Sequence, residues 1–247
     1  MTHRRHRPLP WTTSKYYLIQ THCSIVCSTQ CDGSHDLPER RRAATIRKVA
    51  DVYVIRHGET EWSLTGQHTG RTDVPLTAHG EQQARKAGAV LAELRGTMVP
   101  PRLVLASPRT RAKRTAELAG LNVDDVTEDL AEWDYGDYEG LTTEQIRESA
   151  PDWTVWTHEI PNGETAKEVG DRADAVLARA REELHRGDVV LIGHGHFSRV
   201  LVVRWLGLEP AAGVRIGLDP AGISVLGDER GQAQIRRLNV PPLGEMR

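Results

Sequence analysis

Two histidines carry the most informative chemistry in this 247-residue sequence, and each is followed directly by a glycine: His57 and His194. A neutral imidazole is a good nucleophile toward phosphorus, and the phosphohistidine that it forms is reactive enough for water to hydrolyse it. Arg56 and Arg111 could each contact two phosphoryl oxygens, which the planar guanidinium does better than an ammonium group. These residue types indicate a site for a phosphoryl group.

A short apolar strand is predicted shortly before each of these groups. The runs 49–55, 102–106 and 188–192 are apolar, and helical spacing follows each of them. Repeated strand-then-helix units predict a parallel sheet. In such sheets ligands bind outside the carboxyl ends of the strands, where helix N-termini offer free N–H groups to an anion. We therefore expect the two histidines and Arg111 to face one crevice.

Further elements complete the predicted domain. They are helices over 78–94 and up to Leu118, helices that begin at the capping boxes of Thr142 and Thr165, a helix from His194 to Leu206, and late strands over 222–226 and 234–238. The fold class is therefore α/β, with residues 49–240 forming a three-layer α/β/α sandwich around a mostly parallel central sheet. Four tryptophans have apolar neighbours and are expected to fill the core or the pocket wall: Trp133, Trp153, Trp156 and Trp205.

The composition is that of an ordinary globular protein, with 38% hydrophobic and 27% charged residues. No run of eighteen apolar residues occurs, so a membrane span is not expected. The net charge of -2 gives no reason to expect nucleic acid as a partner. Residues 1–50 hold nine Lys or Arg against three Asp or Glu. We expect a basic tail without regular structure over 1–48 and a short C-terminal tail over 241–247.

The three cysteines all fall within the first fifty residues, at Cys23, Cys27 and Cys31. Their even spacing could suggest a metal site, but no fourth ligand nearby fits zinc, and chance explains the spacing better. The rest of the chain cannot form an internal disulfide, which favours a cytoplasmic location.

Four sequence blocks in a fixed order resemble the signatures of the histidine phosphatase (phosphoglycerate mutase-like) superfamily. They are Arg56–Thr60, Ser107–Ala116, Leu130–Gly140 and Gly193–Gly195. The resemblance extends over about residues 51–240. The segments 66–73 and 132–140 are similar to the branch that contains a yeast sedoheptulose-bisphosphatase and mycobacterial mutase-like acid phosphatases.

This resemblance implies a phosphatase that needs no metal or other cofactor and acts on a small phosphorylated metabolite such as a sugar phosphate or bisphosphate. It implies His57 as the nucleophile, Glu132 as the general acid and base, and Arg56, Arg111 and His194 as phosphate-binding groups. It also implies that Ser63, Thr69, Gly70 and Gly195 contact the substrate. His196 and Arg199 are weaker candidates for holding a second anionic group.

Three other functions deserve comparison with this one. A phosphoglycerate mutase of the same family typically has a longer, basic insertion between the positions of Gly140 and Thr165, which is short here. A binding module that only recognises a phosphorylated ligand usually lacks a catalytic group, whereas every matched position here holds a competent one. A metallohydrolase could use His194 and His196 as ligands, but neighbouring arginines would repel the cation. The sequence favours the phosphatase and leaves the oligomeric state open.

Overall fold

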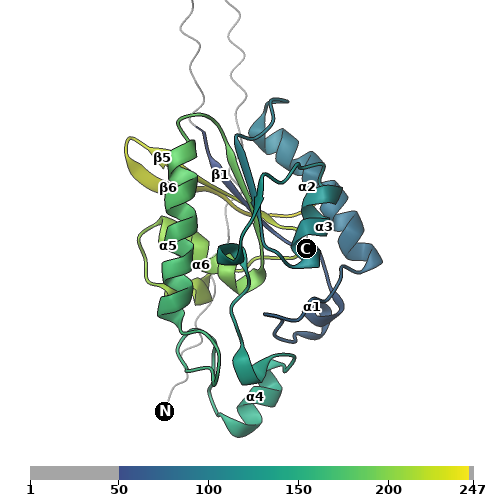
Figure 1. Ribbon diagram of the computed structural model, residues 1–247, viewed down its shortest axis with the longest axis vertical. Helices are drawn as coiled ribbons and strands as arrows, with labels where there is room; N and C mark the ends of the chain where they lie inside the picture. Colours follow the sequence, from purple (N-terminus) through teal and green to yellow (C-terminus); the bar gives the residue numbers. More distant parts are fainter. Residues whose placement is uncertain (1–49, 245–247) are drawn as a thin grey trace, which may run out of the picture. The chain divides into compact units, whose positions relative to one another are not determined.

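A six-stranded sheet forms the centre of residues 50–244, the part of the chain that the computed structural model describes (Figure 1). Its strands are β1 (Val52–Arg56), β2 (Leu103–Ala106), β3 (Asp125–Val126), β4 (Val189–Gly193), β5 (Ile223–Glu229) and β6 (Gln232–Val240). They lie in the order β3-β2-β4-β1-β5-β6. The first four in this order are parallel, and β5 runs antiparallel to both β1 and β6. The predicted mostly parallel sheet is confirmed.

Helices cover both faces of this sheet. On one face lie α2 (Ala78–Arg95) and α3 (Thr110–Leu118), and on the other lie α5 (Ala166–Glu183) and α6 (Gly195–Trp205). Side chains alternate between the faces of a strand. In β1, Val52 and Val54 therefore join the core under α5 and α6, whereas Tyr53 and Ile55 join the core under α2 and α3. The α/β/α layering predicted from the sequence is confirmed.

The two cores differ in the size of their side chains. The core under α2 and α3 relies on alanines such as Ala87 and Ala112, which let these helices approach the sheet closely. The core under α5 and α6 holds the largest aromatic side chains, including all four tryptophans that were expected to be buried: Trp133, Trp153, Trp156 and Trp205. Their predicted burial is confirmed.

Helix starts followed the capping signals, and the elements missed by prediction were short. Capping boxes begin α4 (Thr143–Ser149) at Thr142 and α5 at Thr165, as expected. The structure adds α1 (Glu61–Thr65), strand β3 and the 3-10 helices η1 (Glu128–Leu130), η2 (Gly136–Tyr138) and η3 (Pro210–Arg215). Each added element has six residues or fewer, which is too short to show a helical or strand period in the sequence.

The register of the two central strands determines where the histidines meet. Arg56, the last residue of β1, pairs with Gly193, the last residue of β4. The residues that follow, His57 and His194, therefore lie next to one another at the carboxyl ends of the strands, and the His57 N–H donates to the Gly193 carbonyl at 2.9 Å. The two histidines expected to come together at this edge of the sheet are therefore neighbours in the structure.

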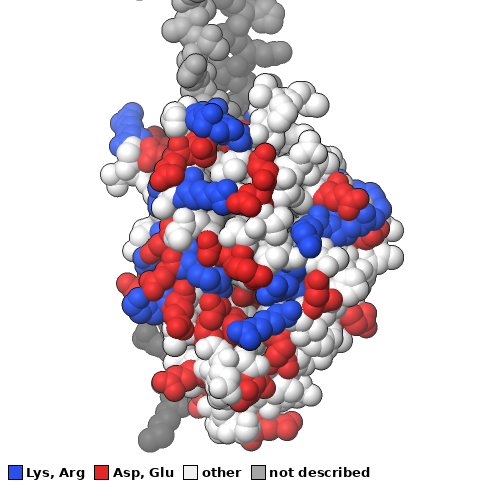
Figure 2. Space-filling view, viewed as in Figure 1, with Lys and Arg blue, Asp and Glu red and all other residues white. Residues whose placement is uncertain are grey.

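Charged side chains of both signs are interleaved on the face drawn in Figure 2. Many of them pair, as Arg179 of α5 does with Asp125 of β3 at 2.7 Å. None of the helices within residues 50–244 is long and apolar enough to cross a membrane. The predicted basic tail over 1–48, with its cysteines, lies outside the described residues, and so do the last three residues of the C-terminal tail predicted over 241–247.

Candidate active site

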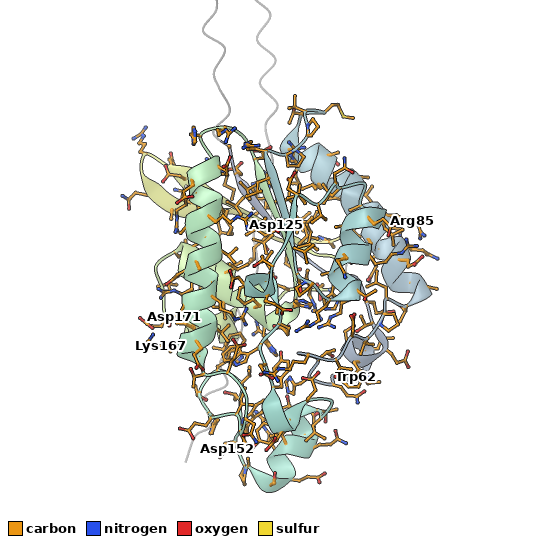
Figure 3. All side chains as sticks on the ribbon, in the orientation of Figure 1. Trp62, Arg85, Asp125, Asp152, Lys167 and Asp171 are labelled. Carbon is orange, nitrogen blue, oxygen red and sulfur yellow. The ribbon has the colours of Figure 1, made fainter. Side chains whose placement is uncertain are left out.

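A cavity of about 290 Å³ opens at the carboxyl ends of β1 and β4. It is lined by Arg56, His57, Thr60, Ser63, Gly66, Gln67, His68, Thr69, Glu132, Tyr135, Thr143, Gly195, His196, Arg199 and Leu218. Ser63 of α1 and Thr143 of α4 belong to this lining, and Gln67, just after α1, forms an isolated β-bridge with Thr142, just before α4. Trp62 marks the position of α1 in Figure 3. A larger neighbouring cavity of about 490 Å³ shares Arg56 and Ser63 but contains neither His57 nor Glu132. The smaller cavity is therefore the candidate active site.

His57 is buried in this cavity as a neutral imidazole. Its Nδ1 lies 2.7 Å from the Gly58 carbonyl oxygen. Because a carbonyl oxygen can only accept, Nδ1 must carry the proton, and Nε2 keeps its free lone pair. Burial, with Arg111 and Arg56 nearby, holds the pKa of His57 well below its usual range. The following glycine is required, because a Cβ on Gly58 would lie 2.4 Å from the Gly80 carbonyl oxygen of α2.

Arg56 reaches the cavity from the end of β1. It donates from Nη1 to the Leu218 carbonyl at 2.6 Å. Its Nε is buried and has no hydrogen-bond partner among the described residues. An unpaired buried N–H is costly unless a ligand accepts its hydrogen bond. Arg56 is thus the lining cation with a donor available to an anion.

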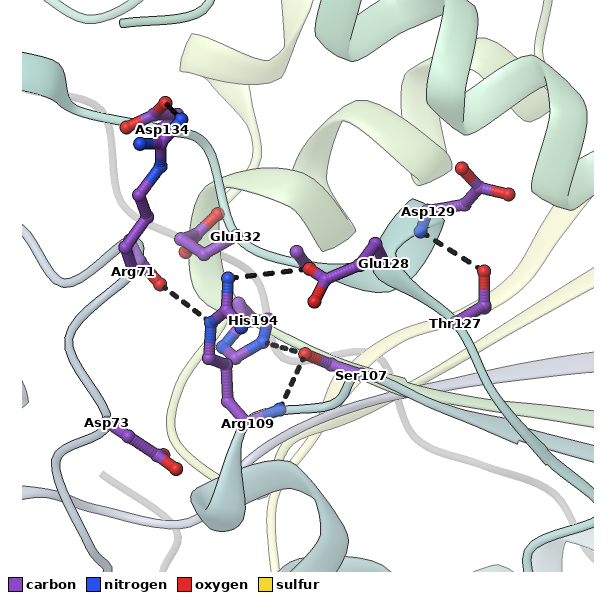
Figure 4. Close-up of polar contacts among 12 residues, drawn as sticks. Arg71, Asp73, Ser107, Arg109, Thr127, Glu128, Asp129, Glu132, Asp134 and His194 are labelled. Carbon is purple, nitrogen blue, oxygen red and sulfur yellow. Dashed lines mark hydrogen bonds and ion pairs between the residues drawn. The ribbon is translucent and has the colours of Figure 1, made fainter.

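Arg111 and His194 lie directly behind the cavity and are fully buried. Arg111 donates from Nε to His194 Nδ1 at 3.2 Å, and its other nitrogens donate to the carbonyls of Thr69, Gly70 and Thr72. Since His194 Nδ1 accepts from Arg111, its Nε2 must carry the proton, which it donates to Ser107 Oγ at 2.7 Å (Figure 4).

Neither group is among the residues that line the cavity, and their nitrogens have hydrogen-bond partners within the fold. Burial, followed by the charge of Arg111, holds the pKa of His194 well below its usual range, so its ring is neutral. The ring centroids of His57 and His194 lie 5.2 Å apart. Arg111 contributes a fixed positive charge from behind His57 and holds the loop 69–72 in place.

Glu132 points into the cavity from the segment between η1 and η2. Its Oε1 accepts from the N–H groups of Trp133 at 2.9 Å and Phe197 at 2.8 Å, and its Oε2 accepts from His196 N–H at 3.0 Å. Two of these donors belong to the first turn of α6, where the free N–H groups of the helix favour a carboxylate. The carboxyl group is therefore fixed beside His57 and Arg56.

The residues expected to contact substrate lie in different situations. Thr69 and Gly195 line the cavity. Ser63 also lines it, but its hydroxyl accepts from the Thr60 N–H and donates to the Thr60 carbonyl in the capping box of α1. Gly70 does not line the cavity, and its N–H donates to the Glu139 carboxylate. These two hydrogen-bond donors already have partners within the fold.

One part of the cavity wall contains groups that the sequence did not single out or ranked low. His68, Tyr135 and His196 line it, and the Tyr135 hydroxyl lies 2.6 Å from His196 Nδ1. Arg199 completes the wall, with its guanidinium 4.5 Å from the Trp156 ring centroid. Tyr135 and His68 lie inside the very blocks that carry the family resemblance, so attention to the neighbours of Glu132 could have found Tyr135.

The side-chain rings of His68, His196 and Tyr135 are all uncharged. Burial lowers the pKa of His68 to about 4 against the opposing pull of Glu139 and Glu144. Burial, followed by Arg199, holds the pKa of His196 well below its usual range. Burial likewise raises the pKa of Tyr135 far above its usual range. The wall therefore offers neutral hydrogen-bond donors and acceptors.

Within residues 50–244, no group of three or more His, Cys, Asp or Glu side chains is arranged to hold a metal ion. The ring nitrogens of His194 are both occupied by Arg111 and Ser107, which leaves none for a metal shared with His196. The arrangement is instead a neutral nucleophile, a fixed carboxyl group and cationic groups around one cavity. Such a set of groups can transfer a phosphoryl group.

Comparison with known proteins agrees with this chemistry. A model described as the histidine phosphatase superfamily (branch 1) matches residues 52–241, a range that includes every residue lining the cavity. An acid phosphatase of Mycobacterium tuberculosis is 50% identical over 189 residues, which cover 76% of this chain and 92% of that protein. A sedoheptulose 1,7-bisphosphatase of Saccharomyces cerevisiae is 35% identical over 182 residues, 63% of this chain and 67% of that protein. The solved structure of an open reading frame of Mycobacterium tuberculosis matches with a TM-score of 0.75 and 48% identity, over 79% of this chain and 100% of that chain.

Proposed function

We infer that this chain, a phosphatase that belongs to the histidine phosphatase superfamily, hydrolyses small phosphomonoesters through a phosphohistidine on His57. The observation that carries this proposal is the tautomer of His57. Its Nδ1–H is held by the Gly58 carbonyl, so that the free lone pair is on Nε2, within a cavity that also contains Arg56 and Glu132. A buried imidazole that is already neutral needs no separate base before it attacks phosphorus.

The proposed reaction has two steps. First, His57 Nε2 attacks phosphorus and the bond from phosphorus to the leaving oxygen breaks, while Glu132 acts as the general acid and gives a proton to that oxygen. Next, a water molecule attacks the phosphohistidine, Glu132 takes a proton from the water, and the bond from phosphorus to Nε2 breaks. Inorganic phosphate leaves, and His57 and Glu132 return to their starting states.

The charge that develops on the phosphoryl oxygens is balanced by fixed cations in this proposal. Arg56 supplies the buried Nε–H that has no other partner. Arg111 supplies a second positive charge from behind His57, in a region from which water is excluded and where electrostatic interactions are strong. Two arginines in these positions support a mechanism without a metal ion, so EDTA should leave turnover unchanged.

The part of the cavity wall that contains His68, Tyr135, His196 and Arg199 supports a polar, hydroxylated leaving group. We call Arg56, His57, Arg111 and His194 the phosphoryl end, and His68, Tyr135, His196 and Arg199 the leaving-group end. Neutral imidazole and phenol groups at the leaving-group end suit sugar hydroxyls, and Arg199 could receive a second anionic group. One relative is a sedoheptulose 1,7-bisphosphatase, which agrees with a sugar phosphate or bisphosphate as the substrate.

Two measurements on purified full-length protein test the proposal. Phosphate release is followed with sedoheptulose 1,7-bisphosphate, fructose 1,6-bisphosphate, 3-phosphoglycerate and p-nitrophenyl phosphate, with 2-phosphoglycerate formation assayed in parallel. Labelled substrate is then quenched in alkali, which preserves phosphohistidine, and the labelled residue is identified. We expect label on His57, and we expect His57→Ala to lose label and at least about 10⁴-fold in kcat.

The exposed His158 provides the matched control, because His158→Ala removes an imidazole that does not line the cavity. This variant should keep both label and turnover. Label on another residue, or turnover that survives His57→Ala, would exclude the proposed nucleophile. Formation of 2-phosphoglycerate without free phosphate would assign a mutase reaction instead.

A further inference from the structure

Arg172 of α5 uses its whole guanidinium group to hold the segment that carries Glu132. Its Nε and Nη2 donate to the two carboxylate oxygens of Glu164 at 2.7 and 2.8 Å. Its Nη1 donates to the carbonyls of Asp129 at 3.0 Å and Ala131 at 3.1 Å, and Nη2 donates to the carbonyl of Glu132 itself at 3.4 Å. A guanidinium has five N–H groups, and here five acceptors take them.

Glu164, the ion-pair partner of Arg172, binds the two residues that follow Glu132. Glu164 Oε2 accepts from the Asp134 N–H at 3.0 Å, and the Glu164 carbonyl accepts from Trp133 Nε1 at 2.8 Å. The residues on both sides of Glu132 are therefore tied to one ion pair. Both side chains of this pair are largely buried, with exposed fractions of 19% and 22%. A bidentate pair of this kind is more rigid than an exposed ion pair.

Arg172 also contacts a residue that binds the Glu132 carboxylate. Its guanidinium carbon lies 4.6 Å from the ring centroid of Phe197. The Phe197 N–H donates to Glu132 Oε1. Arg172 thus touches the backbone of Glu132 at one end and, through Phe197, the first turn of α6 that holds the carboxyl group at the other.

We propose that Arg172 is a positioning residue that fixes Glu132 for proton transfer to the leaving oxygen. This inference rests on the role of Glu132 in the proposed function. A displacement of about 1 Å in a reacting group can lower the rate by about 10²-fold. Loss of the fork of hydrogen bonds should therefore slow the departure of a strongly basic leaving group more than that of a stable one. This difference appears in kcat/KM, which includes the first step but not the hydrolysis of the phosphohistidine.

The test compares substrates whose leaving groups differ in their need for a proton. An alkyl phosphate such as glycerol 3-phosphate leaves as a strongly basic alkoxide, whereas 2,4-dinitrophenyl phosphate leaves as a stable anion. We expect Arg172→Met to lower kcat/KM for the alkyl phosphate by roughly 30- to 100-fold and kcat/KM for the dinitrophenyl ester by less than about threefold. Arg172→Lys keeps the charge but lacks the fork, so it should show the same selectivity, and it gives the answer if Arg172→Met does not fold.

Arg181 provides a matched control on the same helix. Its guanidinium stacks 4.5 Å from the Trp205 ring of α6, as Arg172 stacks on Phe197, but no hydrogen bond joins it to the Glu132 segment among the described residues. Arg181→Met should change kcat/KM for both substrates by the same small factor. Equal losses on the two substrates in Arg172→Lys, or no loss on either, would overturn the proposal.

Glu132→Gln, measured in the same assay, separates this proposal from the proposed function. If Glu132→Gln is selective for the alkyl phosphate and the Arg172 variants are not, Glu132 is the acid and Arg172 does not position it. If Glu132→Gln itself shows no selectivity, the proposed role of Glu132 fails and the inference fails with it.

Discussion

The phosphoryl end and the leaving-group end of the cavity are built in different ways. At the phosphoryl end, the register of β1 and β4 places His57 and His194 side by side, and both lie one residue after a buried parallel strand. At the leaving-group end, His68 and Tyr135 come from loops, and η2 and α4 are short. Parallel strands fix a nucleophile rigidly, whereas loops can vary without disturbing the sheet.

Burial acts on the histidines of both ends, but the charges that surround them differ. Burial keeps the histidines of both ends neutral, but Arg111 and Arg56 lower the pKa of His57 further, whereas Glu139 and Glu144 oppose the effect at His68. The phosphoryl end is therefore built for an anion. The leaving-group end has charges of both signs, because Glu139 and Glu144 lie near His68 whereas Arg199 lies near His196. We infer that the first end determines the reaction and the second determines the substrate.

Among the substitutions that compare the two ends of the cavity, that of Arg56 should have the largest effect, and this effect should not depend on the leaving group. Arg56→Lys keeps a positive charge but removes the buried Nε–H, and loss of one such fixed donor lowers kcat roughly 10²- to 10³-fold. The ratio of kcat/KM between sugar phosphates and p-nitrophenyl phosphate should stay the same. The matched variant Arg199→Lys changes the other end and should alter that ratio. A loss in Arg56→Lys that varies between substrates would break the comparison.

The sequence predicted the phosphoryl end well because that end depends on strands and their order. Buried β-branched runs and helix caps are local signals, and the strand before each histidine was found to within three residues at its start. Each of these strands runs directly into its histidine. The two histidines then lie close together because parallel strands present their carboxyl ends at the same edge of the sheet.

The sequence could not predict how the polar groups share hydrogen bonds. Nothing local indicates that Arg111 donates to three loop carbonyls and to His194, or that the Ser63 hydroxyl belongs to a helix cap. The partners of Arg111 are up to 83 residues away along the chain. His68 and Tyr135 were missed for the same reason, since they lie on separate loops that come together only in the folded chain. His196 and Arg199 lie on α6 soon after His194, and the sequence did indicate them as candidates for holding a second anionic group.

A buried neutral histidine should make the stability of the protein depend on pH. The pKa of His68 is about 4 in the folded chain, whereas a free histidine has a pKa of about 6.5, so the unfolded chain takes up a proton below pH 6.5 that the folded chain does not. This stabilisation is present at neutral pH and is lost as the pH falls from about 6.5 to about 4. Between pH 7 and pH 5 the loss amounts to about 2 kcal/mol for this one group.

His68→Gln removes the contribution of this histidine to the pH dependence of the free energy of unfolding. Urea unfolding at pH 7 and pH 5 should show a smaller drop in the free energy of unfolding for the variant than for the wild type. His185→Gln, a change at an exposed position, should leave the drop as it is in the wild type. An identical drop in His68→Gln and the wild type would mean that His68 can be protonated in the folded protein, and the neutral character of the leaving-group end would need revision.

Tyr135→Phe should have the smallest effect and the most selective one. The hydroxyl of Tyr135 stays protonated and lies 2.6 Å from His196 Nδ1. Because a phenol oxygen can both donate and accept, Tyr135 can also form a hydrogen bond with a substrate hydroxyl. Loss of one hydrogen bond to a bound sugar should lower kcat/KM about tenfold. The value for p-nitrophenyl phosphate, whose leaving group has no such hydroxyl, should change less than about twofold.

The neighbouring Tyr138 serves as the control, because its ring packs on Trp153 and does not line the cavity. Tyr138→Phe should leave kcat/KM for both substrates unchanged. Equal losses on the sugar phosphate and the aryl phosphate in Tyr135→Phe would show that this hydroxyl acts on the phosphoryl group. Tyr135 would then belong to the phosphoryl end and not to the leaving-group end, since its hydroxyl would act in the reaction that all substrates share and would not select among them.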